Sequence, residues 1–313
     1  MTEFWAKASS THRNVLAEGP VWAADTIYWV DIEAGKVFEG RLNGDRVEQT
    51  ARHDFNGTVG AVAVSADGDL LVAEREGLVV VTPTGERMRG PRIVPEGADR
   101  RTNDGSCDPA GRFLIGTLSL GEESSTETLV RVEDDGTLTT LDDDLALSNG
   151  LAWSPDGRLL YSIDTIPGVV WVREYDAASG AIGARREHLR VTDGSPDGVC
   201  VDERGYLWIA VWGAGEVRSF SPTGEHVDTV FVSAPHTSSV AFVGPELDVL
   251  LITTASRDLS AHDLEMYPDA GRLFTARVGV RGTPCAPWAG MQRAWSLPAP
   301  NFEGESPDTA TAN

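Results

Sequence analysis

Three short motifs carry an amide or a carboxyl group at the same point of a repeated pattern. An apolar strand, a turn glycine and a second apolar strand follow each motif, and eight residues separate the oxygen-bearing residue from the turn glycine. The motifs are Asn103-Asp104-Gly105, Ser148-Asn149-Gly150 and Pro196-Asp197-Gly198. The same spacing, counted back from a predicted turn at Thr26, leads to Glu18. Equivalent positions of a closed repeat lie on one ring, so we expect the oxygens of Glu18, Asn103, Asn149 and Asp197 to converge.

Converging carboxylate and amide oxygens are what a hard divalent cation needs. The ring has no His or Cys, which favours Ca²⁺, Mg²⁺ or Mn²⁺ over a thiolate zinc site, and Zn²⁺ is a less expected alternative. Two carboxylates and two amides leave coordination positions for water and substrate. The competing interpretation is that the Asn-Gly and Asp-Gly pairs are turn dipeptides that cap strands. The shared spacing of the four residues favours the metal site.

Arg101 precedes Asn103 by two residues, and strand alternation puts both on the same side. We therefore expect Arg101 near the ring, where a guanidinium can bind the hydroxyls or the carboxylate of a substrate. His236 is the one histidine near the start of a repeat, and its interpretation stays open between a substrate contact and a structural residue. No nucleophile elbow, phosphate loop or dinucleotide motif is present.

The elements that must position these residues form a repeat of roughly 40 to 48 residues, the period of propeller blades. Copies begin near residues 18, 60, 103, 149, 197 and 238. The pattern predicts an all-β, six-bladed β-propeller with four-stranded blades. A strand pair within residues 271–278 is expected to close the ring with an N-terminal strand around residues 14–16. We expect a single propeller domain over residues 1–291 and a disordered, polar C-terminal tail over residues 292–313.

The formal net charge of −22 excludes nucleic acid and anionic membranes as favoured partners. No apolar run is long enough for a transmembrane helix, and the start of the chain lacks the pattern of a signal peptide. Three widely spaced cysteines, Cys107, Cys200 and Cys285, argue against a disulfide framework and for a reducing compartment. We read Cys107 and Cys200 as small core residues. The chain is therefore expected to be cytoplasmic. We also expect it to be a monomer or a small homo-oligomer.

At these motifs the chain resembles the senescence marker protein-30/gluconolactonase/luciferin-regenerating enzyme family. The resemblance covers nearly the full length and includes the stretches that begin at Glu18-Gly19-Pro20, Arg101-Thr102-Asn103 and Asp108-Pro109-Ala110. It implies a six-bladed propeller with one divalent cation in the channel and Glu18, Asn149 and Asp197 as its ligands. It also implies substrate contacts from Arg101 and Asn103, and a general base at Asp197.

One segment departs from the family pattern. The family often supplies a substrate-contacting acid shortly after Gly116-Thr117, and here the acidic run is shifted to Glu122 and Glu123. The resemblance leaves three possibilities open: Glu122 contacts the substrate, Glu123 does so, or neither does.

The expected function is that of a divalent-metal-dependent hydrolase that opens a sugar lactone to an aldonic acid, as a gluconolactonase does. The cation, with Ca²⁺ expected before Zn²⁺, Mn²⁺ or Mg²⁺, would polarise the carbonyl while Asp197 assists water attack. Two alternatives stay open. One is another ester, lactone or phosphotriester hydrolase on the same metal ring, and the other is a non-enzymatic calcium-binding propeller. The sequence leaves the particular lactone undetermined.

Overall fold

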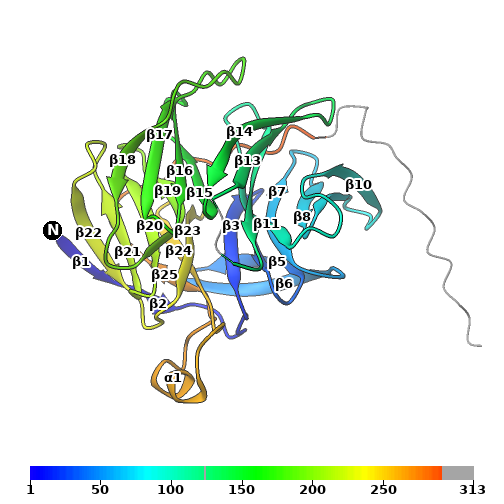
Figure 1. The fold of residues 1–313 in the computed structure, drawn as a ribbon. Coiled ribbons are helices and arrows are strands. Elements are labelled where there is room, and N and C mark those ends of the chain that lie inside the picture. Colours follow the sequence, from blue (N-terminus) through cyan, green and yellow to red (C-terminus); the bar gives the residue numbers. More distant parts are fainter. Residues whose placement is uncertain (123–124, 291–313) are drawn as a thin grey trace, which may run out of the picture.

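The structure is a computed structural model that describes residues 1–122 and 125–290. The described residues form six β-sheets arranged around a common axis (Figure 1). This confirms the predicted six-bladed β-propeller. The predicted tail over residues 292–313 lies outside the described residues.

The first three blades follow the chain in order, from the innermost strand outward. Blade one contains β3 (Ala17–Ala23), β4 (Thr26–Asp31), β5 (Lys36–Asn43) and β6 (Arg46–Asp54). Blade two contains β7 (Val59–Val64), β8 (Leu70–Glu74), β9 (Gly77–Val81) and β10 (Arg87–Arg92). Blade three contains β11 (Arg100–Cys107), β12 (Phe113–Ser119), β13 (Glu127–Val132) and β14 (Leu138–Leu145).

The last three blades include the closure of the ring. Blade four contains β15 (Ser148–Trp153), β16 (Leu159–Asp164), β17 (Val169–Glu174) and β18 (Arg186–Arg190). Blade five contains β19 (Ser195–Val201), β20 (Leu207–Trp212), β21 (Glu216–Phe220), β22 (His226–Phe231) and the N-terminal β1 (Thr2–Trp5). Blade six contains β23 (Thr237–Val243), β24 (Val249–Thr254), β25 (Phe274–Ala276) and β2 (Lys7–Ala8).

Three details differ from the sequence prediction. Residues 271–278 hold one strand, β25, where a strand pair was predicted. Blade five has five strands, because β1 adds in parallel to the outer edge of β22. The N-terminal strand that closes the ring is β2, which pairs with β25, and lies earlier than the predicted segment 14–16. Residues 14–16 still contact blade six, through the hydrogen bond from Asn14 N to the Gly271 carbonyl and an isolated bridge between Leu16 and Ala255.

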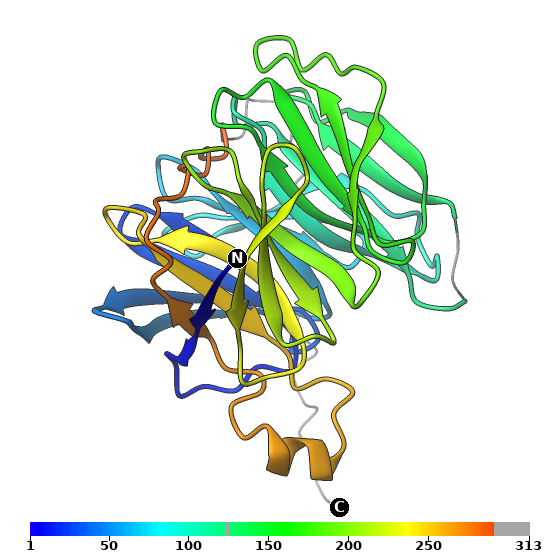
Figure 2. The same cartoon turned by 90° about the vertical axis from the view of Figure 1, so that its left-hand side faces the viewer.

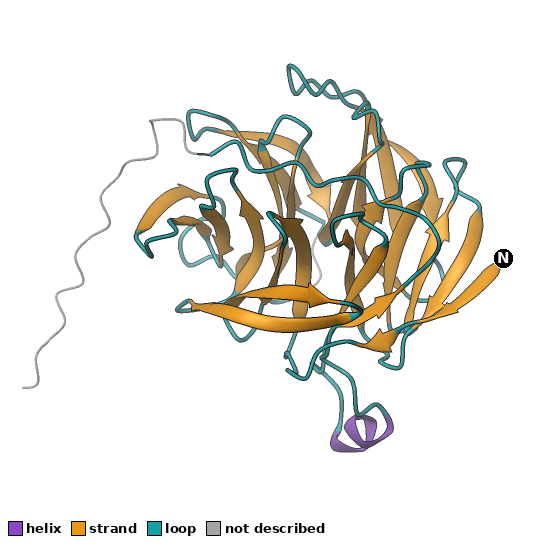
Figure 3. Ribbon diagram, turned by 180° about the vertical axis from the view of Figure 1, so that it is seen from behind, coloured by secondary structure: helices purple, strands orange, loops and turns teal. Residues whose placement is uncertain are grey.

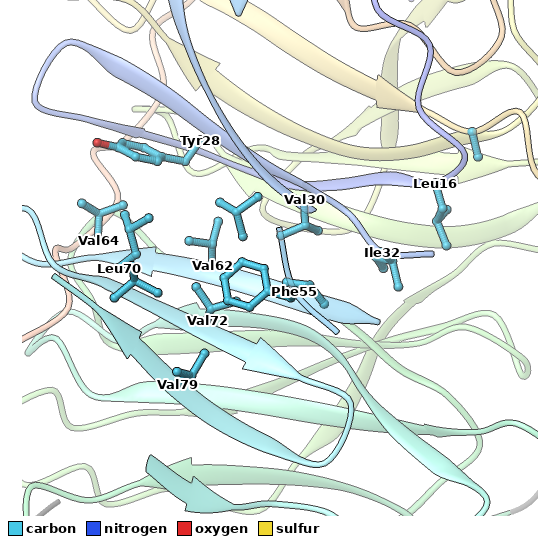
Figure 4. Close-up of a cluster of buried hydrophobic side chains, with 14 residues drawn as sticks. Leu16, Tyr28, Val30, Ile32, Phe55, Val62, Val64, Leu70, Val72 and Val79 are labelled. Atoms are coloured by element: carbon cyan, nitrogen blue, oxygen red, sulfur yellow. The ribbon is translucent and has the colours of Figure 1, made fainter. Parts of the chain in front are cut away.

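The core is divided into six clusters of buried side chains, one between each pair of neighbouring blades. Strand alternation explains this, because successive side chains of a strand point to opposite faces of its sheet. In β7, Val62 and Val64 pack against blade one (Figure 4), whereas Ala61 and Ala63 pack against blade three. Both faces of each blade are therefore buried, which accounts for the continuous apolar runs in the inner strands.

Different segments cover the two ends of the inner strands. Residues 281–289, here called the strap, cross the end where the inner strands finish. Trp288 N donates to the Val64 carbonyl at 2.8 Å, and Thr283 N donates to the Val201 carbonyl at 3.0 Å, so the strap links blades two and five. At the other end, where the inner strands begin, the loop after β24 carries α1 (Ala261–Met266), which projects away from the sheets (Figures 2 and 3). Among the described residues, no helix could cross a membrane.

Candidate metal and substrate site

All six inner strands depart from regular pairing near their first residues. The shifts in register lie between Glu18 and Val21, Val59 and Ala61, Thr102 and Gly105, Asn149 and Leu151, Pro196 and Val199, and Thr237 and Ser239. Such irregularities re-aim side chains and increase the local twist of a strand. A shift in register therefore recurs at each ring position. The side chains there do not have to alternate strictly between the two faces of a blade.

The glycines of two of the three motifs, Gly150 and Gly198, allow neighbouring inner strands to approach each other. A Cβ atom on Gly150 would lie 2.5 Å from the Asp197 carbonyl oxygen, and one on Gly198 would lie 2.1 Å from Ser239 Oγ. Gly105, Gly150 and Gly198 lie within β11, β15 and β19, and none of them has a positive φ. The alternative interpretation of these motifs as turn dipeptides is therefore wrong. Glycine is needed for close contact between blades.

The structure brings together the three predicted metal ligands. Glu18, Asn149 and Asp197 are each only 6% exposed. Burial raises the pKa of Asp197 well above its usual range, the charge of Asp104 raises it further, and the neighbouring Asn149 amide and Glu18 carboxyl group partly offset the rise. Side chains from blades one, four and five therefore lie close together, and their role as metal ligands stays a prediction.

Two oxygens of this set are buried without a hydrogen-bond partner. They are Asn149 Oδ1 and Asp197 Oδ1. Asn149 Nδ2 donates to Thr165 Oγ1 at 3.1 Å, and this hydrogen bond uses the amide nitrogen. Burying a polar atom without a partner costs about 1–3 kcal/mol. A cation between the two oxygens would satisfy both, so these residues fit a divalent ion with oxygen ligands.

The charges of the site also favour a bound divalent cation. Burial raises the pKa of Glu18 well above its usual range, and the charges of Asp197 and Asp104 raise it further. Burial also raises the pKa of Asp104 to about 6. When ionised, these three carboxylates carry three negative charges, and the guanidinium of Arg101 beside Glu18 and Asp197 supplies one positive charge. The surplus of two negative charges matches one divalent cation.

The candidate set is not a purely acidic cluster. Within residues 1–122 and 125–290, no group of three or more His, Cys, Asp or Glu side chains is arranged to hold a metal ion. The third predicted ligand is the Asn149 amide, and Asp104 lies close enough to raise the pKa values of Glu18 and Asp197. Sequence reasoning did not select Asp104. The signal that the sequence offers is its position directly after Asn103, before Gly105 of the same motif.

Arg101 and Asn103 form one buried unit beside the carboxylates. Arg101 Nη1 donates to Asn103 Oδ1 at 2.8 Å and to the Thr102 carbonyl at 2.9 Å. Asn103 Nδ2 donates to the Ser148 carbonyl of the next blade at 2.9 Å. Burial lowers the pKa of Arg101 to about 10, with a further contribution from the charge of Arg257. The guanidinium is thus held next to Glu18 and Asp197, where the sequence predicts a substrate contact.

The other predicted substrate contacts lie on the loop between β12 and β13. Glu122 is exposed on this loop, and Glu123 lies outside the described residues. The loop leaves β12 at the end of blade three that holds Arg101, because Arg101 pairs with Leu118. A role for either glutamate in substrate binding stays a prediction.

A cavity of about 550 Å³ adjoins the ring on the side of the strap. Its walls include residues 19–21, 104–107, 151–157, 199–201, 239–242 and 283–287. All three cysteines line it. Cys107 is buried in the cluster between blades two and three, Cys200 is partly buried, and Cys285 is exposed. The predicted core position is therefore confirmed for Cys107 and only partly for Cys200.

Fold and site together define a six-bladed β-propeller with buried carboxyl and amide side chains gathered where its inner strands begin. The sequence model of the SMP-30/gluconolactonase/LRE-like region matches residues 16–256, and the chain belongs to this family. The resemblance seen in the motifs is thereby confirmed.

Three similar proteins illustrate this membership. Pentonolactonase XacC of Haloferax volcanii is 34% identical over 280 residues, which cover 86% of this chain and 93% of that protein. A 6-deoxy-6-sulfogluconolactonase of Pseudomonas putida is 34% identical over 277 residues, with 86% and 93% coverage. The crystal structure of a calcium-binding protein, regucalcin, from Agrobacterium tumefaciens has a TM-score of 0.84 at 26% identity, and the match covers 92% of this chain and 98% of that one.

Proposed function

We propose that the protein is a divalent-cation-dependent hydrolase that opens a sugar lactone to the corresponding aldonic acid. The observation that carries this proposal is the pair of buried oxygens without partners, Asn149 Oδ1 and Asp197 Oδ1, beside Glu18. Membership of the family and the names of the two lactonases support a lactone as the substrate class. Calcium is the expected ion, since it accepts carboxylate and amide oxygens in irregular geometry.

When bound, the cation supplies a Lewis acid that polarises the lactone carbonyl and stabilises the negative charge that develops on its oxygen. Glu18, Asn149 and Asp197 would hold it. Thr165 fixes the orientation of the Asn149 amide, because its hydroxyl accepts from Asn149 Nδ2 and donates to the Pro196 carbonyl at 2.9 Å.

Arg101 and Asn103 orient the substrate. The hydrogen bonds that Arg101 makes within the described residues use Nη1, which leaves Nε and Nη2 to donate to lactone hydroxyl groups. The bond from Nη1 to Asn103 Oδ1 keeps the guanidinium in place. Positioning of this kind presents one face of the carbonyl to the attacking water.

Asp197 acts as the general base. Its second carboxylate oxygen, Oδ2, accepts a proton from water as the new bond forms between the water oxygen and the carbonyl carbon. The bond between that carbon and the ring oxygen then breaks, and the leaving alkoxide takes up the proton from Asp197. The product is an open-chain hydroxy acid. General-base assistance of this kind contributes on the order of a hundredfold or more in rate.

The test compares initial rates of gluconolactone hydrolysis by apo-protein and by protein reloaded with Ca²⁺, Mn²⁺ or Zn²⁺. Reversible loss of activity on chelation, and loss of turnover in Asp197→Ala, are expected. Full activity in excess chelator, with no metal in the purified protein, would refute the proposal. A panel of aryl esters and phosphotriesters separates a lactonase from another hydrolase on the same ligand set.

A further inference from the structure

The cavity on the side of the strap gathers all the cysteines of the chain. Only short stretches of the sequence form its walls, yet Cys107, Cys200 and Cys285 are all among them. Cys107 is the last residue of β11 in blade three, Cys200 lies in β19 in blade five, and Cys285 belongs to the strap. Their wide spacing argues against a disulfide framework in the sequence, but the propeller brings the three thiols to one chamber.

On the side of blade five, the backbone of the strap is fixed beside Cys200. Thr283 donates to the Val201 carbonyl twice, from its N–H at 3.0 Å and from Oγ1 at 3.1 Å, and Val201 directly follows Cys200. Cys285 lies two residues after Thr283, and two residues span at most about 7 Å. The backbone of Cys285 therefore lies close to this attachment.

On the side of blade three, the strap contacts the surroundings of Cys107. Ala286, the residue after Cys285, packs against the buried cluster that contains Cys107. Ala289 N donates to the Gly111 carbonyl at 2.9 Å, in the turn that follows the strand of Cys107. A disulfide needs Cα atoms about 4.4–6.8 Å apart. Because Cys285 is one residue from a contact with the cluster of Cys107, we regard Cys107 as the partner that it reaches.

The thiols differ in their access to solvent. Cys285 is exposed, whereas Cys107 is buried. Burial raises the pKa of Cys107 well above its usual range, and the charge of Cys285 raises it further. Desolvation raises the pKa of the Cys285 thiol as well. An oxidant in solution therefore meets Cys285 first, and because the thiolate is the reactive form, the reaction should become faster as the pH rises.

We infer that Cys285 is an oxidation site and that its product is a reversible disulfide with Cys107, which fixes the strap across the channel. This inference does not rest on the proposed function. The oxidant is a peroxide. The Cys285 thiolate attacks one peroxide oxygen, the oxygen–oxygen bond breaks, and hydroxide leaves and takes up the proton of the thiol as water. The product of this step is a sulfenic acid at Cys285.

The second step uses the buried thiol. The Cys107 sulfur attacks the sulfenic sulfur of Cys285, the sulfur–sulfur bond forms, and the sulfur–oxygen bond breaks. The hydroxide that leaves takes up the proton of Cys107 as a second water. The two thiols together lose two electrons, which the peroxide gains. A dithiol reverses the reaction by thiol–disulfide exchange.

The experiment treats the full chain, at low protein concentration, with hydrogen peroxide and then counts free thiols in the unfolded protein. The wild type should lose two of its three thiols, and mass spectrometry of a digest should show one pair of peptides joined through Cys285 and Cys107. The bond closes a long loop between residues 107 and 285. The melting temperature should therefore rise by about 5–10 °C and return to its first value after reduction with dithiothreitol.

Two variants complete the experiment. Cys285→Ser should keep both remaining thiols, and its melting temperature should not change on the same treatment. Cys200→Ala is the matched control, because Cys200 lines the same cavity but takes no part in the bond. It should still give the pair of peptides joined through Cys285 and Cys107. The peptide map of the wild type identifies the partner of Cys285 without any substitution in the core.

Several results would overturn the inference. Retention of all three thiols in excess peroxide, or loss of thiols without a joined pair of peptides, would show that Cys285 and Cys107 do not meet. A bond from Cys285 to Cys200 would contradict the role given to Cys107. A bond only between two chains, seen on a non-reducing gel, would show that Cys285 faces away from the channel. None of these measurements uses lactone hydrolysis, so a failure of the proposed function leaves them unaffected.

Discussion

The hydroxyl group of Thr165 accepts a hydrogen bond from Asn149 Nδ2 at 3.1 Å and thereby fixes which end of the amide faces Asp197. Thr165 itself is anchored to the Pro196 carbonyl, directly before Asp197 in the chain. One buried hydroxyl thus links two predicted ligands from adjacent blades. Residues that orient metal ligands typically alter metal affinity by about 10–100-fold when replaced.

Thr165→Val should therefore weaken cation binding by about 10–100-fold. The variant keeps the shape of the side chain, but it leaves the Asn149 amide free to rotate and the Pro196 carbonyl without its donor. Calcium or manganese titration of apo-protein measures the effect. Thr165→Ser keeps the hydroxyl and should bind nearly as well as the wild type. Unchanged affinity in the valine variant would contradict the role given to this hydroxyl.

Asp104→Asn should also weaken cation binding, by about tenfold. The change lowers the surplus of negative charge at the site from two to one and leaves the predicted ligands in place. Asp156→Asn is a matched control, because Asp156 lines the same cavity and is exposed to solvent. Equal affinities of the two variants, measured by calorimetry, would show that the Asp104 charge does not act on the ion.

Arg101→Met should separate substrate binding from cation binding. The loss of hydrogen bonds from a charged donor should lower kcat/KM by about 10–100-fold. Cation affinity should not fall, since removal of the positive charge increases the negative surplus. Steady-state kinetics and metal titration on one preparation give both values. Arg158→Met, at an 84% exposed arginine, should change neither. A parallel loss of cation affinity in Arg101→Met would point to collapse of the site instead.

Gly198→Ala should destabilise the fold by about 1–3 kcal/mol, as overpacking of a close contact does. The added Cβ would lie 2.1 Å from Ser239 Oγ and 2.6 Å from Ser239 Cα, so a rotation of the serine side chain cannot relieve the clash. Denaturant unfolding measures the change. Gly183→Ala is the control, because its Cβ would lie 3.3 Å from Glu174 Cβ, at a contact that a small shift relieves. Equal stabilities of the two variants would contradict the requirement for close contact between β19 and β23.

Local patterns in the sequence predict most of the propeller. The turn glycines Gly111, Gly157 and Gly205 have positive φ values of 86°, 71° and 82°, as tight turns between apolar strands require. Repetition of this unit also predicts the convergence of Glu18, Asn149 and Asp197. Each copy of the unit is recognised from residues close together in the chain, and the repetition of the unit then relates positions that are far apart.

Features that depend on distant residues were not predictable in the same way. The strand β2 has two residues, and its partner Thr275 lies far along the chain, so no local pattern identifies it. The role of Gly198 depends on Ser239 in the next blade, and an Asp-Gly pair resembles a turn when its neighbour is unknown. Asp104 directly follows Asn103, and strand alternation would point it away from the ring; only the irregular pairing there brings it close to Glu18 and Asp197.

The two N-terminal strands complete different sheets at different times during synthesis. The partner of β1 is β22, at residues 226–231, whereas β2 needs β25, at residues 274–276. During synthesis on a ribosome, the partner of β1 is complete some forty residues before the partner of β2. Blade six lacks its two outer strands until the chain reaches β25. A nascent chain that stalls between these points would hold an open ring, with the edge of blade six unprotected against pairing with another chain.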